Sequence, residues 1–153
     1  MSILKRISNG VKTAYAHCDA PCGVYDPALA RVAAEAVLQL TKKILELKKP
    51  SPNEGAAHQA YLNTFMRYIL IKEEQADLAK RELLILWTDY FKPEHVDMYP
   101  DLHLLFWKAA KLCSSCKREV SLERAHELMD AVKNIHEIFW ITKHKEAPWV
   151  TAA

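Results

Sequence analysis

Two thiols and an imidazole near the N-terminus form the stretch of this chain best suited to bind a metal. His17, Cys18 and Cys22 fall within the run HCDAPCGVYDP at 17–27. Thiolate sulfur and imidazole nitrogen bind zinc, copper, nickel and iron-sulfur centres, so the residue types leave the metal open. A structural zinc site needs four closed ligands, usually as two separated pairs, and this stretch offers only three side chains. Backbone nitrogen must therefore complete the set.

A cut in the chain just before His17 would supply that nitrogen. The new terminal amine and the deprotonated amide of Cys18 would form chelate rings with the Cys18 thiolate, and Cys22 sulfur would be the fourth in-plane donor. This square-planar set of two nitrogens and two sulfurs indicates Ni(II) or Cu(II). The ring of His17 is then free to bind axially when the metal is oxidised. We interpret the stretch as a metal-binding hook.

Three later strings accompany the hook. They are WTDYFKP at 87–93, YPDLHLL at 99–105 and IFWITK at 138–143. In order and spacing, the hook and these strings resemble the nickel-containing superoxide dismutases, over roughly residues 17–145. The resemblance implies an enzyme that converts two superoxide ions and two protons to oxygen and hydrogen peroxide. It also implies a homohexamer with one nickel ion per protomer and the hooks near subunit interfaces.

The resemblance assigns the metal ligands and the redox chemistry to the hook. Nickel would be held by the His17 amine and ring, the Cys18 amide and thiolate, and the Cys22 thiolate. The anionic donors make Ni(III) accessible, so the metal can cycle between Ni(II) and Ni(III). These three residues are the predicted metal ligands and, together with Tyr25, the predicted catalytic residues.

Further residues are predicted to surround the metal. By the resemblance, Tyr25 and Tyr90 line the approach to nickel, and Lys92 attracts the anionic substrate. We expect Asp19 to accept hydrogen bonds from hook amides. Pro21 is expected to force the tight reversal that brings the second cysteine back to the metal.

The chain departs from the family pattern at three positions. Ala20 stands where leucine is common, Ala33 where some members have the acidic residue that steadies the axial imidazole, and Gln75 where its arginine partner stands. Second-shell hydrogen bonds orient and tune a metal-bound histidine. The joint loss of both partners indicates a different support for His17.

Residues 1–16 have the composition of a removable leader. The segment is basic and free of acidic residues, and Ala14-Tyr15-Ala16 has the small-x-small pattern of a cleavage site. A His17 nitrogen left in a peptide bond is an amide and cannot serve as an amine ligand. The resemblance implies a pro-peptide that a processing protease cuts between Ala16 and His17.

Length, composition and charge indicate one globular all-α domain. The chain has 153 residues, 50% of them apolar, and only three glycines. No apolar run approaches the ~20 residues of a membrane span, so we expect no membrane partner. Without residues 1–16, 18 basic and 19 acidic residues remain, a formal charge of −1. Clustered basic residues are absent, and we expect no nucleic-acid partner.

Periodicity and capping signals predict an up-and-down four-helix bundle with the hook at its N-terminus. Residues 17–146 form the hook and bundle, residues 91–99 a loop, and residues 147–153 a loose tail. The predicted helices begin at Asp26-Pro27, at the capping box Ser51-Pro52-Asn53-Glu54, at Pro100 and at Ser121, and end near Lys48, Asp89, Cys116 and Lys143.

Two other functions fit parts of the sequence. In the first, Cys18 and Cys22 join Cys113 and Cys116 in one zinc site that staples the bundle. In the second, the protein is a non-enzymatic interaction module. Its partner helix would bind the aromatic residues Phe91, Tyr99, Phe106, Trp107, Phe139 and Trp140. The four cysteines are expected to be reduced thiols in a cytoplasmic compartment, because the chain has no secretory h-region.

Overall fold

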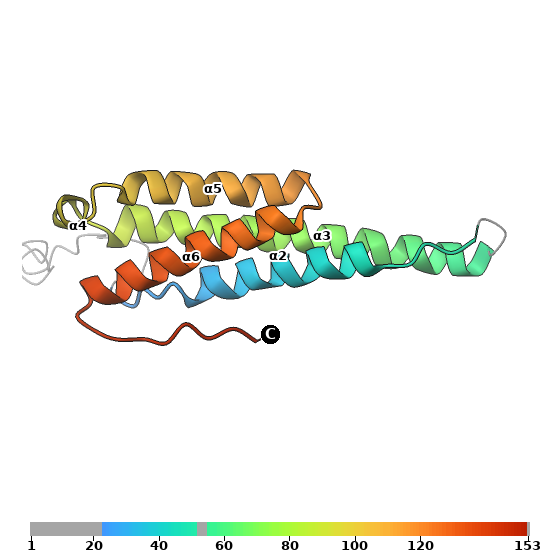
Figure 1. The fold of residues 1–153 in the computed structure, drawn as a ribbon, viewed down its shortest axis with the longest axis horizontal. Helices are drawn as coiled ribbons and strands as arrows, with labels where there is room; N and C mark the ends of the chain where they lie inside the picture. The colour runs from blue at the N-terminus through green and yellow to red at the C-terminus, as the bar shows by residue number, and fades with distance from the viewer. Residues whose placement is uncertain (1–22, 52–54, 153) are drawn as a thin grey trace, which may run out of the picture.

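Four long helices pack side by side in a computed structural model that describes residues 23–51 and 55–152. Successive helices run in opposite directions (Figure 1). Each long helix contacts the next along the chain, and the last packs back onto the first. The described residues contain no strand. The helices are α2 (Ala28–Glu46), α3 (Gly55–Ile85), α5 (Leu102–Arg118) and α6 (Leu122–Thr142). The predicted all-α, up-and-down four-helix bundle is confirmed.

Local sequence signals start two of these helices. The Oδ1 atom of Asp26 accepts a hydrogen bond from the Ala28 amide at 2.8 Å, ahead of α2. Ser121 Oγ likewise accepts from the Arg124 amide at 3.2 Å and begins α6. Both side chains satisfy amides that have no partner within the first helical turn. The predicted cap at Ser121 is confirmed. At the start of α2 the N-cap is Pro27 and not the predicted Asp26, whose side chain reaches the first amide of the helix from one position earlier. The capping box at 51–54 lies largely outside the described residues.

A short helix occupies the region that the sequence predicted to be a loop at 91–99. This helix, α4 (Pro93–Met98), begins with a proline at its first position, and the Lys92 amide donates to Nδ1 of His95 at 3.2 Å. Proline is well suited to a first helical turn because its missing amide hydrogen needs no partner there. The loop prediction was therefore wrong, and the signal that could have corrected it was already in the sequence.

The end of α3 widens into a π-helical turn, η1 (Leu86–Tyr90). The Phe91 amide donates to the Leu86 carbonyl, five residues back, at 3.0 Å. One extra residue in a helical turn shifts the faces on which the following side chains lie. This turn carries the tyrosine of the WTDYFKP string to the end of the bundle.

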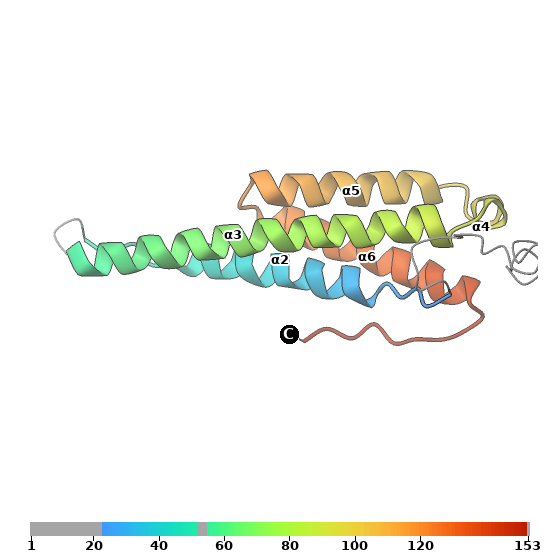
Figure 2. The same ribbon diagram turned by 180° about the vertical axis from the view of Figure 1, so that it is seen from behind.

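The two ends of the bundle differ in how completely their helices are covered. Lys72 is the first buried residue of α3, so the helical turns before it contribute nothing to the core. Both views show the start of α3 projecting beyond α5 and α6 (Figures 1 and 2). Leu62, Met66 and Leu70 are exposed on this projecting part. None of the described helices is both long and apolar enough to span a membrane.

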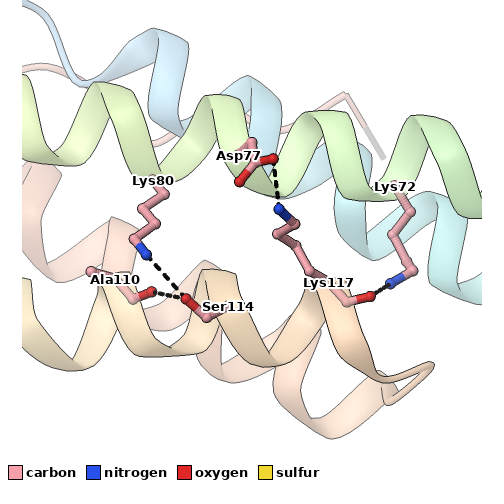
Figure 3. Close-up of polar contacts among 6 residues, drawn as sticks. All are labelled: Lys72, Asp77, Lys80, Ala110, Ser114 and Lys117. Atoms are coloured by element: carbon pink, nitrogen blue, oxygen red, sulfur yellow. Dashed lines mark hydrogen bonds and ion pairs between the residues drawn. The ribbon is translucent and has the colours of Figure 1, made fainter.

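Polar side chains cross the contact between α3 and α5. Lys117 Nζ lies 2.7 Å from Asp77 Oδ2, and Lys80 Nζ donates to Ser114 Oγ at 3.2 Å (Figure 3). Lys72 is different because its side chain is only 1% exposed. Its ammonium donates to the carbonyls of Cys116, Lys117 (3.2 Å) and Glu119 (3.1 Å).

Lys72 caps the end of α5 through its three donors. The last carbonyls of a helix have no partner within it, and a cation there also interacts favourably with the helix dipole. Burial lowers the pKa of Lys72 from its usual value, while the three carbonyls favour the charged form. Three donors on one nitrogen face three carbonyl oxygens, and this arrangement describes a charged ammonium group.

Replacing Lys72 with methionine is expected to destabilise the bundle by about 1–3 kcal/mol, because carbonyls at the end of α5 lose their donor. Urea unfolding followed by circular dichroism measures the change. Lys80→Met is the matched control, since it removes only the bond to Ser114 and should lose about 0.5–1 kcal/mol. Equal losses in the two variants would contradict the capping role.

The C-terminal tail makes specific contacts that the prediction of a loose tail did not include. Residues 147–152 run back from the end of α6 (Figure 1). The ring of Trp149 packs on His136 with centroids 5.3 Å apart, and the Ala152 amide donates to Glu35 Oε1 at 2.6 Å. An aromatic anchor and a charge-assisted hydrogen bond hold this segment against α6 and α2.

Candidate active site

The predicted site divides between residues inside and outside the described part of the chain. Tyr25, Tyr90 and Lys92 are described. The hook residues lie outside the described residues, and so does the predicted cleavage site. Those residues are Ala16, His17, Cys18, Asp19, Pro21 and Cys22.

The structure brings the two predicted tyrosines together at one end of the bundle. The rings of Tyr25 and Tyr90 have centroids 5.9 Å apart and planes inclined by 53°. Tyr25 stands just before Asp26 at the start of α2, and Tyr90 is the last residue of η1. The start of α2 and the end of η1 therefore place the two tyrosines side by side, and their role beside a metal stays a prediction.

Aromatic neighbours hold the Tyr90 ring on several sides. Phe139 is closest, with a centroid distance of 4.4 Å, and Phe91 meets the ring edge-on at 4.9 Å. His95 of α4 stacks on it at 5.6 Å with planes inclined by 22°. The Tyr90 hydroxyl lies 2.7 Å from Thr142 Oγ1 on α6. Helix α4, which the sequence analysis missed, thus contributes directly to the site.

Two lysines flank this cluster in different ways. Lys92, the predicted substrate-attracting residue, has a 66% exposed side chain, and its ammonium lies 3.9 Å from the carboxylate of Glu94. Lys143 extends its ammonium over the Tyr90 ring, 4.8 Å from the centroid. A cation in this position is attracted by the negative face of the ring. Sequence reasoning gave Lys143 no role, although it closes the IFWITK string.

Cys113 and Cys116 lie in the bundle core and are free thiols. They are 0% and 2% exposed. Burial raises the pKa of Cys113 to about 12 and that of Cys116 to about 11. A thiol that stays protonated is a poor metal ligand and a poor nucleophile. Across the described ranges, no group of three or more His, Cys, Asp or Glu side chains could hold a metal ion.

These two thiols are expected to resist alkylation in the folded protein. Metal-free protein treated with iodoacetamide at pH 8 should be modified at Cys18 and Cys22 and remain unmodified at Cys113 and Cys116 until urea is added. Mass spectrometry of the digested chain measures this. Rapid modification of Cys113 in the native protein would contradict the burial that keeps its pKa high.

Most of the aromatic residues that suggested an interaction module are internal. Phe91, Phe106 and Phe139 belong to the core and are at most 8% exposed. Trp107 is the exception, because 53% of its surface is exposed on α5. The aromatic set therefore serves mainly to pack the bundle, and one tryptophan remains available to a neighbouring molecule.

Comparison with known proteins identifies the family that the hook and the later strings resemble. Residues 12–143 match the family model described as nickel-containing superoxide dismutase. The curated nickel superoxide dismutase of Streptomyces seoulensis is 41% identical over 128 residues, which cover 84% of this chain and 88% of the relative. That of Streptomyces coelicolor is 38% identical over 141 residues, covering 92% and 98% respectively.

Solved structures agree in fold as well. A crystal structure of nickel-containing superoxide dismutase, with nickel ligation corresponding to the oxidised state, superposes with a TM-score of 0.72 at 40% identity. A native nickel superoxide dismutase structure gives 0.71 at 38% identity. Each comparison covers 84% of this chain and 99% of the other. None of these matches is to a zinc-stapled or non-enzymatic helical protein.

Proposed function

The chain belongs to the nickel-containing superoxide dismutase family, and we propose that His17, Cys18 and Cys22 hold the nickel ion on which its dismutase activity depends. Two thiolates, an imidazole and backbone nitrogen form a donor set that suits square-planar nickel. The described residues offer no competing cluster of metal-binding side chains. The donor set therefore fits the metal that the family uses.

The meeting of Tyr25 and Tyr90 is the observation that carries this proposal. Tyr25 stands three positions after Cys22, a length of chain that spans at most about 11 Å. The metal would therefore be held close to the tyrosine pair. Tyr25 and Tyr90 line its approach, and Asp19 and Pro21 support the hook.

Each part of the site has a separate chemical task. The bound nickel supplies a one-electron redox couple that can both oxidise and reduce superoxide. Lys92 and Lys143 place positive charge beside the tyrosine pair, and a local excess of one sign of charge raises the encounter rate of an oppositely charged substrate. The packed rings of Phe91, His95 and Phe139 hold Tyr90 in place.

Activation requires removal of residues 1–16 by a processing protease. The supporting reason is chemical: cleavage between Ala16 and His17 converts an amide nitrogen, whose lone pair is delocalised, into an amine that can bind metal. We therefore propose that the full-length chain is a precursor.

Self-association into a homohexamer is part of the proposal. Trp107 is 53% exposed, and Leu62, Met66 and Leu70 are exposed on the projecting part of α3. Large apolar side chains grouped on a surface favour contact with another protein. A second copy of the chain is the partner that the family resemblance implies.

We also propose a cytoplasmic location. Cys113 and Cys116 are free thiols, as expected in a compartment where cellular reductants keep cysteines reduced.

Intact mass and metal analysis of the protein, co-expressed with its processing protease, tests the proposal. A chain that begins at His17, carries one nickel per protomer and has six times the protomer mass in native mass spectrometry is the expected result. Retention of zinc by the uncut chain, lost on Cys113→Ala, would overturn the assignment of the metal ligands.

A further inference from the structure

The hydrogen bonds around Tyr90 determine which group supplies each proton. Thr142 Oγ1 lies 2.7 Å from Tyr90 Oη and 2.8 Å from the carbonyl oxygen of Phe139. A carbonyl oxygen can only accept, and a threonine hydroxyl has one proton to donate. Thr142 therefore donates to Phe139 and accepts from Tyr90. The single phenolic proton of Tyr90 is committed to Thr142.

The rest of the Tyr90 environment cannot reverse this arrangement. Its ring contacts are made with the rings of Tyr25, Phe91, His95 and Phe139. The ammonium of Lys143 faces the ring and is a donor without acceptor capacity. Among the contacts of Tyr90 in the described part of the chain, Thr142 is the acceptor of its hydroxyl, and the lone pairs of that hydroxyl can accept from other donors.

Thr142 can accept from Tyr90 because its position on α6 gives its own proton another acceptor. It is the last residue of α6, and its hydroxyl returns to a carbonyl three residues earlier. The Phe139 carbonyl accepts from the Lys143 amide at 3.1 Å, and its second lone pair accepts from the Thr142 hydroxyl. Thr142, at the end of α6, thus fixes the direction of the hydrogen bond that Tyr90 makes from the end of η1.

We propose that Thr142 is a positioning residue of the dismutase site that holds the Tyr90 phenol as a hydrogen-bond acceptor toward the substrate approach. The inference rests on the proposed function, which places nickel beside Tyr25 and Tyr90. Reduction of superoxide to hydrogen peroxide takes up one electron and two protons per superoxide ion. With its proton held by Thr142, Tyr90 does not supply either of them. Its role is to orient donors, including a protonated peroxide product, by accepting from them.

The first test uses metal-free protein, and its result does not depend on dismutase activity. The tyrosine doublet in ultraviolet resonance Raman spectra reports whether a phenol donates or accepts hydrogen bonds. The contribution of Tyr90 is isolated by subtracting the spectrum of Tyr90→Phe. We expect the donor signature in the wild-type protein and in Thr142→Ser, and its loss in Thr142→Val, which keeps the shape and removes the hydroxyl.

Thr142→Ala serves as a second variant if the valine protein fails to fold, because it removes the same hydroxyl with less bulk. A wild-type spectrum in which Tyr90 only accepts, or an unchanged donor signature in Thr142→Val, would overturn the inference. This outcome is independent of whether the hook binds nickel.

The second test measures the nickel-loaded, processed enzyme. In Thr142→Val we expect kcat/KM for superoxide to fall by about tenfold, with Thr142→Ser recovering most of the loss. Equal losses in both variants would indicate a packing role and overturn the inference. An inactive wild-type enzyme would contradict the proposed function instead, and the spectra would still decide the direction of the hydrogen bond.

Discussion

Replacing Cys22 with serine will remove nickel from the processed protein and lower its dismutase activity by more than about 100-fold, since even outer-shell partners of a metal ligand contribute 10–100-fold. A serine hydroxyl stays protonated at neutral pH and is a far weaker donor to nickel than a thiolate. The loss of an anionic sulfur also removes the electron density that makes the oxidised metal accessible. Metal analysis and stopped-flow decay of superoxide measure the two effects.

The matched control for this variant is Cys113→Ala. It removes a thiol that the structure places in the core, 0% exposed, and the described residues contain no cluster of side chains that could hold a metal ion. We expect full nickel occupancy and nearly unchanged activity, with some loss of stability. Nickel retained by Cys22→Ser, or lost from Cys113→Ala, would contradict the ligand assignment.

Leaving residues 1–16 on the chain will abolish nickel-dependent activity, because the His17 nitrogen then belongs to a planar peptide group. The experiment inserts a recognition sequence for a site-specific protease directly before His17. The same preparation is loaded with nickel before and after cutting. We expect no dismutase activity before the cut and activity with one nickel per protomer after it.

A single-residue extension provides the sharper control. A chain cut so that one glycine remains before His17 has a free amine and the same length within one residue, yet its amine stands one position too far from Cys18 for the same chelate rings. We expect this chain to be inactive. Equal activity in the extended and exact chains would show that the terminal amine of His17 is not a ligand.

The second-shell support of His17 differs from the family pattern. Ala33 is fully buried in α2 among the core residues, and Gln75 is half-buried on α3. An alanine methyl group can neither accept from an imidazole nor pair with an arginine. The support of the His17 ring by another residue stays a prediction, because His17 lies outside the described residues.

Local signals in the sequence predicted much of the fold. The contacts of Asp26 and Ser121 at helix starts were predictable, because such a contact involves an amide only two or three positions away. The spacing of apolar residues predicted the four long helices, because this spacing is also a local property of each segment. The short connections between them predicted the antiparallel order. Helix α4 was missed because its two turns are too short to show a period, and the π-helical turn at Leu86–Tyr90 leaves no period of its own.

Residue types and spacing predicted the donor set of the site, and the motifs predicted the family, which the comparisons confirmed. His17, Cys18 and Cys22 lie within one short run, so covalent geometry alone keeps their donor atoms within reach of one metal ion. The metal preference then follows from the elements and charges of those atoms. None of this depends on how the helices pack.

The contacts around the tyrosine pair could be seen only in the folded structure. Tyr25 and Tyr90 come from distant parts of the chain, and Thr142 reaches Tyr90 from the end of a third helix. The burial of Cys113 and the ammonium of Lys72 at the end of α5 were equally invisible in the sequence. Such contacts depend on the rotation and offset of packed helices, which the apolar period of each helix does not specify.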